Sequence, residues 1–411
     1  MRSPRLLMLL AMVLGLMLLL AACGEDEVAD EPEDPDDDEE VVDDEPEDDP
    51  EEPDEEEDAP EDGDEPEDAA DLDADVEAAG GLCEGDAADV EAPDGYTVGL
   101  VTDIGNVDDG TFNQYAYEGQ LAAAECFGID DENIVVVETQ SEADYDRNIS
   151  SVLAAEPDAV ITVGFLLQDA TEEYAQENPD VNFIGVDQFS EGEIENFVGL
   201  QFREDQGGFL AGAMAALMTE SNVVAAVGGP EEVPAIPRFL NGYAQGAAHV
   251  DEGVNVLDIY LTSFNDPAEG RSAAEQFLGE GADVLFGAAG VTGSGAIQAA
   301  AESDAWVIGV DQDEYYTTFG EGDVTGADRI VTSAVKRVDV GVFEQIRADI
   351  EDTFEPGNFT LDAENEGITY APFHDADVPD DVADQIEEVR EGLADGSIDT
   401  GVDPATGELL E

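Results

Sequence analysis

The side chain with the clearest chemical potential in this chain is a single lysine. Lys336 is the only lysine among 411 residues, 106 of which are Asp or Glu, and it lies in the run IVTSAVKRVDVGVF. In a chain with so few cationic side chains, the single lysine is expected to have a specific structural or functional role. Lys336 is therefore either part of a functional site or the partner in a buried ion pair, because charges of both kinds occur in such settings.

Aromatic, acidic and glycine residues collect in the segments that follow apolar runs. These segments are DDGTFNQYAYEG (108–119), GFLLQDAT (164–171), GGPEEVPAIPRFLNGY (228–243), AAGVTGSGA (288–296) and DQDEYY (311–316). Rings stack on rings, carboxylates accept hydrogen bonds, and glycines allow a close approach of the backbone. The set suits a small neutral ligand with a flat ring and hydroxyl groups.

Other kinds of chemistry find little support. The glycines 290, 293 and 295 form G-x-x-G-x-G, which is not the G-x-G-x-x-G order of a dinucleotide-binding loop. Neither a Ser-His-Asp set, nor a Cys-His pair, nor a nucleophile elbow is visible. His249 and His374 are far apart and no Cys or His cluster occurs, so we expect no metal site and no cofactor.

The elements that must position these residues follow an alternating pattern. Eight short runs rich in branched residues predict fully buried parallel strands, because they do not alternate polar and apolar residues. They begin at residues 96, 133, 159, 182, 222, 255, 283 and 306. The stretches between them, such as FNQYAYEGQLAAAECF and GGFLAGAMAALM, are typical of helices, and Thr111 with Gln114 has the spacing of a capping box. The pattern predicts an α/β fold with parallel sheets.

We expect two lobes rather than one wide sheet, since the repeat pauses at a polar junction near residue 219. The N-lobe would span about 94–219 with a return segment at about 334–360. The C-lobe would span about 220–333 with the C-terminal segment. Loops at the carboxyl ends of the two sheets would then frame a cleft for a ligand.

The N-terminal part predicts export and a tether. Residues 1–22 have the layout of a signal peptide, and the end of the apolar run, Leu20-Ala21-Ala22-Cys23, resembles the bacterial lipobox, in which the cysteine is lipidated. The alternative is an uncleaved signal anchor with an incidental cysteine. Residues 24–93 hold 39 acidic residues and no Lys or Arg, which predicts a disordered tether over 23–93.

The charge of the remaining chain restricts its surroundings and partners. Residues 94–411 carry 67 acidic and nine basic residues, a net charge of −58. Molar salt screens such self-repulsion, so we expect a salt-loving host. The same field argues against nucleic acid as a partner. Cys83 and Cys126 could form a disulfide in an oxidising compartment, or could both be unpaired.

Seven blocks, read in order, resemble the basic membrane protein family of lipoproteins, which includes purine nucleoside receptors of ABC importers. The blocks are DDGTFNQYAYEG, GFLLQDA, QGGFLAGAMAAL, VGGPEEVPAIPRFLNGYAQG, GADVLFGAAGVTGSGAIQAA, WVIGVDQD and TSAVKRVDVGVF, and they run from about residue 96 to 345. The resemblance implies the two-lobed, type I periplasmic-binding-protein fold. It also implies a nucleoside as ligand.

By this resemblance each candidate residue receives a role. The base would stack between Tyr117 and Phe239, near Asp109, Asn113 and Asp169, with Gly290 lending its backbone. The ribose diol would be held by Asp311 and Lys336, because a carboxylate and an ammonium together satisfy hydroxyl groups that both donate and accept.

The resemblance further implies a lipid-anchored protein outside the cytoplasm, not an enzyme. Its ligand would be a nucleoside, with a purine nucleoside as the first candidate. Its other partners would be an ABC permease with its ATPase, and the membrane through the anchor. We expect a monomer. The alternatives are a sensory lipoprotein that uses the same fold to detect a small ligand, and an enzyme that acts on nucleosides.

Overall fold

The computed structural model of this chain describes residues 81–410. The predicted signal peptide, Cys23 and the tether up to residue 80 lie outside the described residues. The last part of the predicted tether is folded rather than disordered: a 3-10 helix, η1 (Gly85–Asp89), buries Ala87. The backbone N–H of Ala92 donates to Phe127 O at 2.8 Å.

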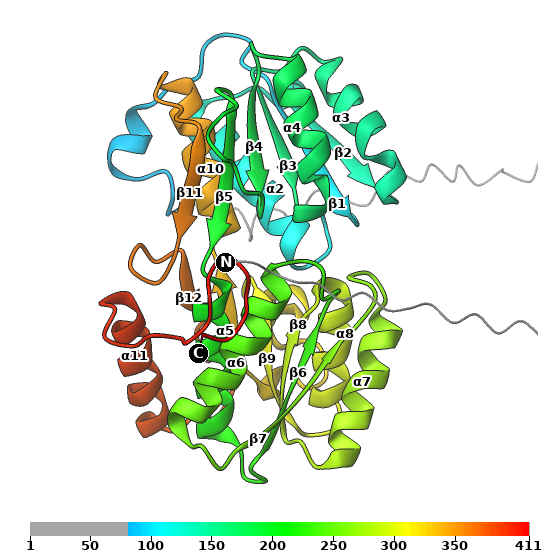
Figure 1. The fold of residues 1–411 in the computed structure, drawn as a ribbon, viewed down its shortest axis with the longest axis vertical. Helices are drawn as coiled ribbons and strands as arrows, with labels where there is room; N and C mark the ends of the chain where they lie inside the picture. The colour runs from blue at the N-terminus through cyan, green and yellow to red at the C-terminus, as the bar shows by residue number, and fades with distance from the viewer. Residues whose placement is uncertain (1–80, 411) are drawn as a thin grey trace, which may run out of the picture. The chain divides into compact units, whose positions relative to one another are not determined.

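Two six-stranded sheets form two lobes, as the sequence predicted (Figure 1). The N-lobe sheet has the order β11-β5-β4-β3-β1-β2, and the C-lobe sheet has the order β12-β10-β9-β8-β6-β7. All strand pairs are parallel except β10 with β12. The N-lobe strands are β1 (Val98–Ile104), β2 (Ile134–Thr139), β3 (Ala159–Val163), β4 (Asn182–Val186), β5 (Phe197–Phe202) and β11 (Gly357–Leu361). The C-lobe strands are β6 (Val223–Gly228), β7 (Asn255–Tyr260), β8 (Val284–Ala288), β9 (Trp306–Asp311), β10 (Ile330–Lys336) and β12 (Ile368–Tyr370).

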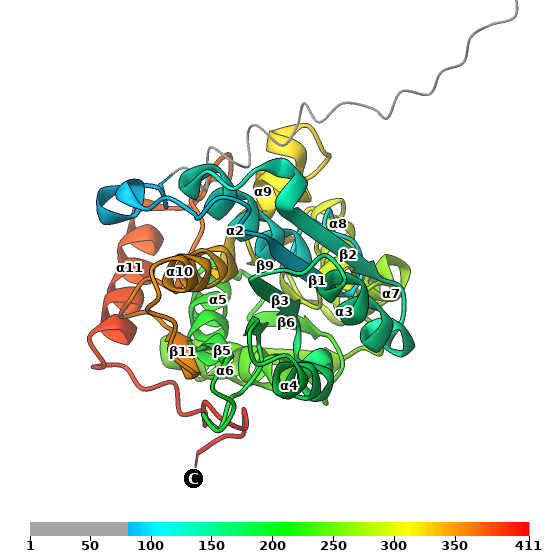
Figure 2. The ribbon, with the colours of Figure 1, turned by 90° about the horizontal axis from the view of Figure 1, so that it is seen from above.

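Helices cover both faces of each sheet (Figure 2). In the N-lobe, α2 and α10 pack together on one face, while α3 and α4 cover the other. In the C-lobe, α5 packs on α6, and α7 packs on α8. The N-lobe helices are α2 (Phe112–Phe127), α3 (Tyr145–Leu153), α4 (Gln168–Glu177) and α10 (Val338–Ile350). The C-lobe helices are α5 (Glu204–Met218), α6 (Ala235–Val250), α7 (Pro267–Glu280), α8 (Gly290–Ala301), α9 (Glu314–Thr317) and α11 (Asp380–Ala394).

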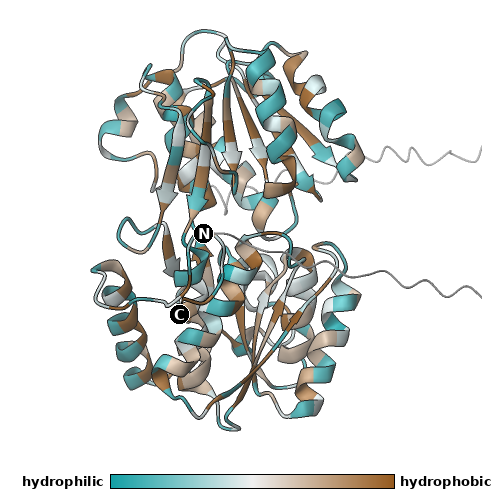
Figure 3. Ribbon diagram, in the orientation of Figure 1, coloured by the Kyte–Doolittle hydropathy of each residue, from teal (hydrophilic) through white to brown (hydrophobic). Residues whose placement is uncertain are grey.

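The strands at the centre of each sheet bury their side chains on both faces. Every residue of β3 and β8 is buried, as expected for continuous apolar runs covered by helices on both sides. Figure 3 shows these strands as hydrophobic segments between helices whose outer faces are hydrophilic. The prediction of full burial was wrong for β2 and β7, which are edge strands and stay partly exposed.

The chain crosses between the lobes three times. It passes from β5 to α5 at Arg203, from β10 to α10 at Arg337, and from β11 to β12 over residues 362–367. Arg203 N donates to Leu361 O at 3.0 Å and Arg337 N donates to Gly367 O at 2.9 Å, so the third crossing is bonded to the other two. The expected lobe boundaries near residues 219 and 334 therefore differ from the observed crossings at residues 203 and 337. The reason is that α5 packs in the C-lobe and that β10 is a strand of the C-lobe sheet.

A disulfide ties the N-terminal end of the described chain to the N-lobe. Cys83 and Cys126 are bonded with a Cα–Cα distance of 5.5 Å, which joins the segment before η1 to the last turn of α2. The sequence had left this pairing open. Among residues 81–410, no helix has the length and apolar character needed to cross a bilayer.

Candidate functional site

A cavity lies between the two lobes at the carboxyl ends of their strands. Clefts at this edge of parallel sheets are the usual place of small-molecule sites. Small and branched apolar side chains line it, together with four aromatic rings and four carboxyl groups. The rings are those of Phe112, Phe165, Phe239 and Phe264, and the carboxyl groups are those of Asp103, Asp109, Asp187 and Asp311. Lys336 is the only cationic side chain among the lining residues.

Lys336 lies at the end of β10, and 2% of its side chain is exposed. Its Nζ is 2.6 Å from Asp187 Oδ2 and 3.1 Å from Glu204 Oε1. It also sits 4.9 Å and 4.8 Å from the ring centroids of Phe112 and Phe202. Burial alone would lower the pKa of Lys336, but the surrounding carboxylates raise it, so the side chain is charged. Lys336 is thus a buried ion-pair partner, which was one of the two interpretations of this residue, and it also lines the cavity.

Asp311, which the family resemblance paired with Lys336 as a ribose-binding residue, lines the cavity but forms no ion pair with Lys336 in residues 81–410. Within the described part of the chain, Lys336 pairs with Asp187 and Glu204 instead. Burial raises the pKa of Asp311 to about 7, although Lys336 opposes this shift. Asp311 therefore lines the cavity as a carboxyl group that forms no ion pair with a cationic side chain of residues 81–410.

Asp187 and Asp311 occupy equivalent places in the two lobes. Each is the fourth residue of an I-G-V-D-Q segment, and each has a positive φ, 58° and 65°. Asp187 directly follows β4 and Asp311 ends β9, which are the fourth strands of their lobes in chain order. Asp187 Oδ1 is buried without a hydrogen-bond partner in residues 81–410. Because an unpaired buried acceptor is costly, this atom is suited to receive a hydrogen bond from a ligand. Asp187 was not among the predicted site residues, although the repeated segment could have revealed it.

Two of the candidate residues, Asp109 and Asn113, line the cavity at the start of α2. Asp109 also caps the helix, since its carboxylate accepts from the backbone N–H groups of Thr111, Asn113 and Gln114 and from the Asn113 amide. The predicted capping box was wrong: Thr111 makes no side-chain cap, and Gln114 instead accepts from Gly110 N. A carboxylate at a helix N-terminus is also favoured by the helix dipole.

Two predicted residues do not reach the cavity. Tyr117 packs half-buried against the N-lobe core, one and a half turns along α2 from Phe112, which lines the cavity in its place. Asp169 is exposed in the first turn of α4. In both cases the sequence segment around the residue resembles the family, but the residue's position around the helix axis directs its side chain away from the cavity.

Phe239 and Gly290 do line the cavity. Gly290 begins α8 with φ +54°, and a Cβ there would lie 3.3 Å from Phe264 O. Phe165 and Phe264 were not singled out from the sequence. They follow β3 and β7, in loops at the same carboxyl edge that the fold argument had indicated.

Direct hydrogen bonds join the lobes beside the cavity. Thr317 Oγ1 donates to Gly110 O at 2.7 Å, and Gln312 Nε2 donates to Thr111 O at 3.1 Å. Thr317 and Gln312 belong to the C-lobe, whereas Gly110 and Thr111 belong to the N-lobe. The structure is therefore a closed arrangement, in which a ligand would be sequestered from solvent.

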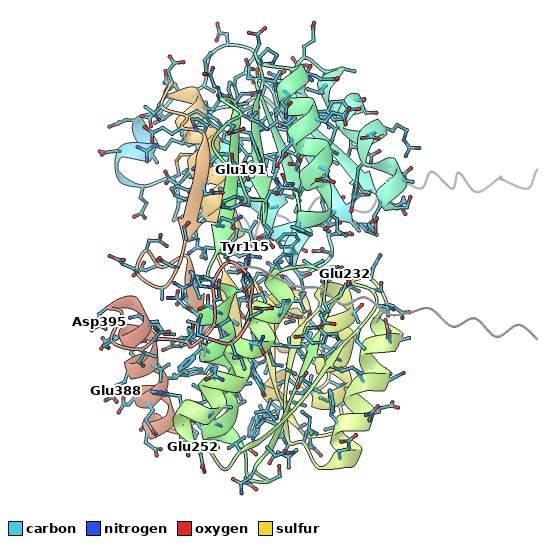
Figure 4. The ribbon with its side chains drawn as sticks, viewed as in Figure 1. Tyr115, Glu191, Glu232, Glu252, Glu388 and Asp395 are labelled. Atoms are coloured by element: carbon cyan, nitrogen blue, oxygen red, sulfur yellow. A yellow bond between two sulfur atoms is a disulfide. The ribbon has the colours of Figure 1, made fainter. Side chains whose placement is uncertain are left out.

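The surface is dominated by carboxylates (Figure 4), and labelled residues such as Glu191, Glu252 and Glu388 project outward from both lobes. All nine basic side chains between residues 94 and 411 form ion pairs with Asp or Glu. No group of three or more His, Cys, Asp or Glu residues with the arrangement of a metal site occurs in residues 81–410.

Two α/β lobes, joined by three crossings and enclosing a cavity, define the class of two-lobed solute-binding proteins. The chain belongs to the family described as ABC transporter substrate-binding protein PnrA-like, whose model matches residues 96–395. This family is one of substrate-binding proteins rather than enzymes.

Relatives and solved structures agree with this assignment. The chain is 31% identical over 320 residues to the CD4+ T-cell-stimulating antigen of Listeria innocua, covering 74% of this chain and 87% of that protein. It is 31% identical over 322 residues to the ABC transporter nucleoside-binding protein BmpA of Lactococcus lactis, covering 76% and 83%. A solute-binding protein structure from Aeropyrum pernix K1 superposes with a TM-score of 0.64 at 25% identity, covering 74% of this chain and 92% of the other.

Proposed function

We propose that this protein captures a nucleoside, and in the first place a purine nucleoside, between its two lobes and delivers it to an ABC permease. The observation that carries the proposal is the composition of the cavity: four aromatic rings together with a buried lysine and buried carboxyl groups. The related Lactococcus lactis protein is named as nucleoside-binding.

The cavity offers separate surroundings for a base and a sugar. Phe239 and the other lining rings can stack on a flat base, an arrangement worth about 0.5–1.5 kcal/mol beyond the area buried. Lys336 can donate hydrogen bonds to ribose hydroxyls, while Asp311 and Asp187 Oδ1 can accept them. Asp109 and Asn113 stand near the base, with Gly290 allowing close approach of the backbone.

The ligand should be uncharged. A phosphate group would enter a cavity where carboxyl groups outnumber the one lysine, on a domain of net charge −58. Like charges placed together cost several kcal/mol, by the usual estimate for juxtaposed charges. We therefore expect nucleosides to bind and nucleotides to be rejected.

We further propose export and lipidation at Cys23, with residues 24–80 serving as a tether to the membrane. The chain would then work as a monomer on the extracytoplasmic side, beside a permease and its ATPase. A sensory lipoprotein remains the alternative, and the genes next to this one would distinguish the two, since a transporter subunit lies beside those of its permease and ATPase.

Calorimetric titration in molar salt with a panel of nucleosides and the matching nucleotides tests the ligand. Binding heat from at least one nucleoside, and none from its monophosphate, is the expected result. Absence of heat with every nucleoside would remove the ligand assignment. Formation of free base or another product during the titration would instead support an enzyme.

A further inference from the structure

A chain of buried charges leads from the cavity to the C-terminal segment. Lys336 Nζ lies 3.1 Å from Glu204 Oε1, and the other oxygen, Oε2, lies 3.0 Å from Arg238 Nη1. Arg238 Nη2 in turn donates to Ala405 O at 3.2 Å. Glu204 is fully buried and Arg238 is 8% exposed, yet neither residue lines the cavity.

The positions of Glu204 and Arg238 are fixed by close helix packing. Glu204 is the first residue of α5 and Arg238 is the fourth residue of α6. A Cβ at Gly208 of α5 would lie 2.1 Å from Phe239 O, so only glycine lets the two helices approach this closely. The pair is therefore held by the backbone rather than by the flexibility of two long side chains.

The charges in this chain do not balance. Glu204, Asp187 and Asp311 face two cations, Lys336 and Arg238. Burial would raise the pKa of Glu204, but Lys336 and Arg238 together lower it, so Glu204 is ionised. One positive charge then remains for two aspartates.

Further carboxyl groups surround the two aspartates. The charges of Asp109 at the start of α2 and Glu314 on α9 raise the pKa of Asp311, and the charge of Asp187 raises the pKa of Asp103 at the end of β1. Burial raises the pKa of Asp187 and raises that of Asp311 to about 7, and the charge of Arg238, on the far side of Glu204, acts against this shift at Asp187.

We propose that Arg238 is a positioning residue of the ligand site, which acts by sharing Glu204 with Lys336. Because Arg238 neutralises part of the Glu204 charge, the ammonium group of Lys336 stays available to donate a hydrogen bond to a ligand in the cavity. Arg238 thereby sets the pH at which Asp187 and Asp311 ionise and the pH range in which hydroxyl groups can bind to them. The consequence for binding rests on the proposed function, whereas the titration of the empty cavity does not.

The chain supplies its own reporter for this proposal. Because Lys336 is the only lysine, growth with lysine labelled at ¹³Cε and ¹⁵Nζ gives one side-chain signal in the NMR spectrum. The dependence of that signal on pH, in ligand-free protein and molar salt, reports the ionisation of the carboxyl groups around it. The variants are Arg238→Gln and Glu204→Gln, with Arg271→Gln as the control, because Arg271 pairs with Glu302 at the surface.

The two variants should shift the titration in opposite directions. Arg238→Gln leaves one cation for three carboxyl groups, so the midpoint should rise. The rise should be at most about one pH unit, because a charge in direct contact shifts a carboxyl pKa by about one to three units and Arg238 acts across Glu204. Glu204→Gln leaves two cations for two aspartates, so the midpoint should fall by a similar amount. Arg271→Gln should leave it unchanged.

General damage to the fold cannot imitate this result, since it would move both midpoints in the same direction. Unchanged midpoints, or two shifts of the same sign, would overturn the proposal. If one variant does not fold, the other still tests the sign of its own shift. With a nucleoside that binds, the affinity of Arg238→Gln should fall at least about fivefold at pH 7, the lower end of typical coupling between linked sites.

Discussion

Replacing Lys336 with methionine should destabilise the protein in a strongly pH-dependent way. Methionine keeps the length of the side chain but removes its charge. Glu204 would keep Arg238 as a partner at 3.0 Å, whereas Asp187 would lose the one side chain among residues 81–410 with which it forms an ion pair. The cost is therefore that of one uncompensated buried carboxylate, about 3–5 kcal/mol in the free energy of unfolding.

The protein can avoid this cost by protonating Asp187, and the expense of doing so depends on pH. For a carboxyl with its ordinary pKa of about 4, protonation costs about 5.5 kcal/mol at pH 8 but only about 1.5 kcal/mol at pH 5. The loss of stability should thus be about 3–5 kcal/mol at pH 8 and shrink to about 1–2 kcal/mol at pH 5, following those two costs.

Denaturant unfolding of wild type and Lys336→Met, in molar salt at pH 5 and pH 8, measures this difference. The double variant Lys336→Met/Asp187→Asn is the matched control: it removes the unpaired carboxylate and should recover most of the stability at pH 8. It should not recover ligand affinity, because the ammonium donor is still absent. If Lys336→Met were as stable as wild type at pH 8, the buried ion pairs could not have the role described here.

Four further variants test other parts of the site and of the fold. Phe239→Leu should weaken nucleoside binding by roughly tenfold through the lost ring stacking, whereas Tyr117→Phe should leave the affinity measured by calorimetry unchanged; equal effects would contradict the assignment of the lining rings. Asp109→Ala should lower the free energy of unfolding by about 1–2 kcal/mol because it removes the cap of α2, and a neutral effect would show that the cap is dispensable. Cys126→Ser opens a covalent loop of 43 residues and should lower the free energy of unfolding by up to about 4 kcal/mol in the chain-entropy model. Reductant added to the wild-type protein should cause a loss of the same size, as measured by denaturant unfolding.

The order of elements and the class of site could be predicted because both depend on local patterns. Continuous branched runs separated by helical stretches specify two parallel sheets, and the loops at their carboxyl ends contain most of the lining residues. Asp109, Asn113, Phe239, Gly290, Asp311 and Lys336 were singled out by the family resemblance, and all six line the cavity.

What the sequence did not reveal depends on helical phase and on long-range pairing. Tyr117 and Phe112 are five residues apart on α2, and only the packing of that helix decides which ring faces the cleft. The pairing of Lys336 with Asp187 joins residues 149 positions apart in sequence and from different lobes. No spacing rule predicts such a contact, although the repeated I-G-V-D-Q segment marks both of the aspartates concerned.

The most direct test of the central claim is a nucleoside titration of the lysine-labelled protein in molar salt, because its one lysine signal belongs to Lys336. If the nucleoside binds in the cavity against Lys336, that signal should shift and saturate at the same ligand concentrations as the calorimetric heat. Binding heat with an unmoved lysine signal would mean that the ligand occupies another place. That result would contradict the site described here.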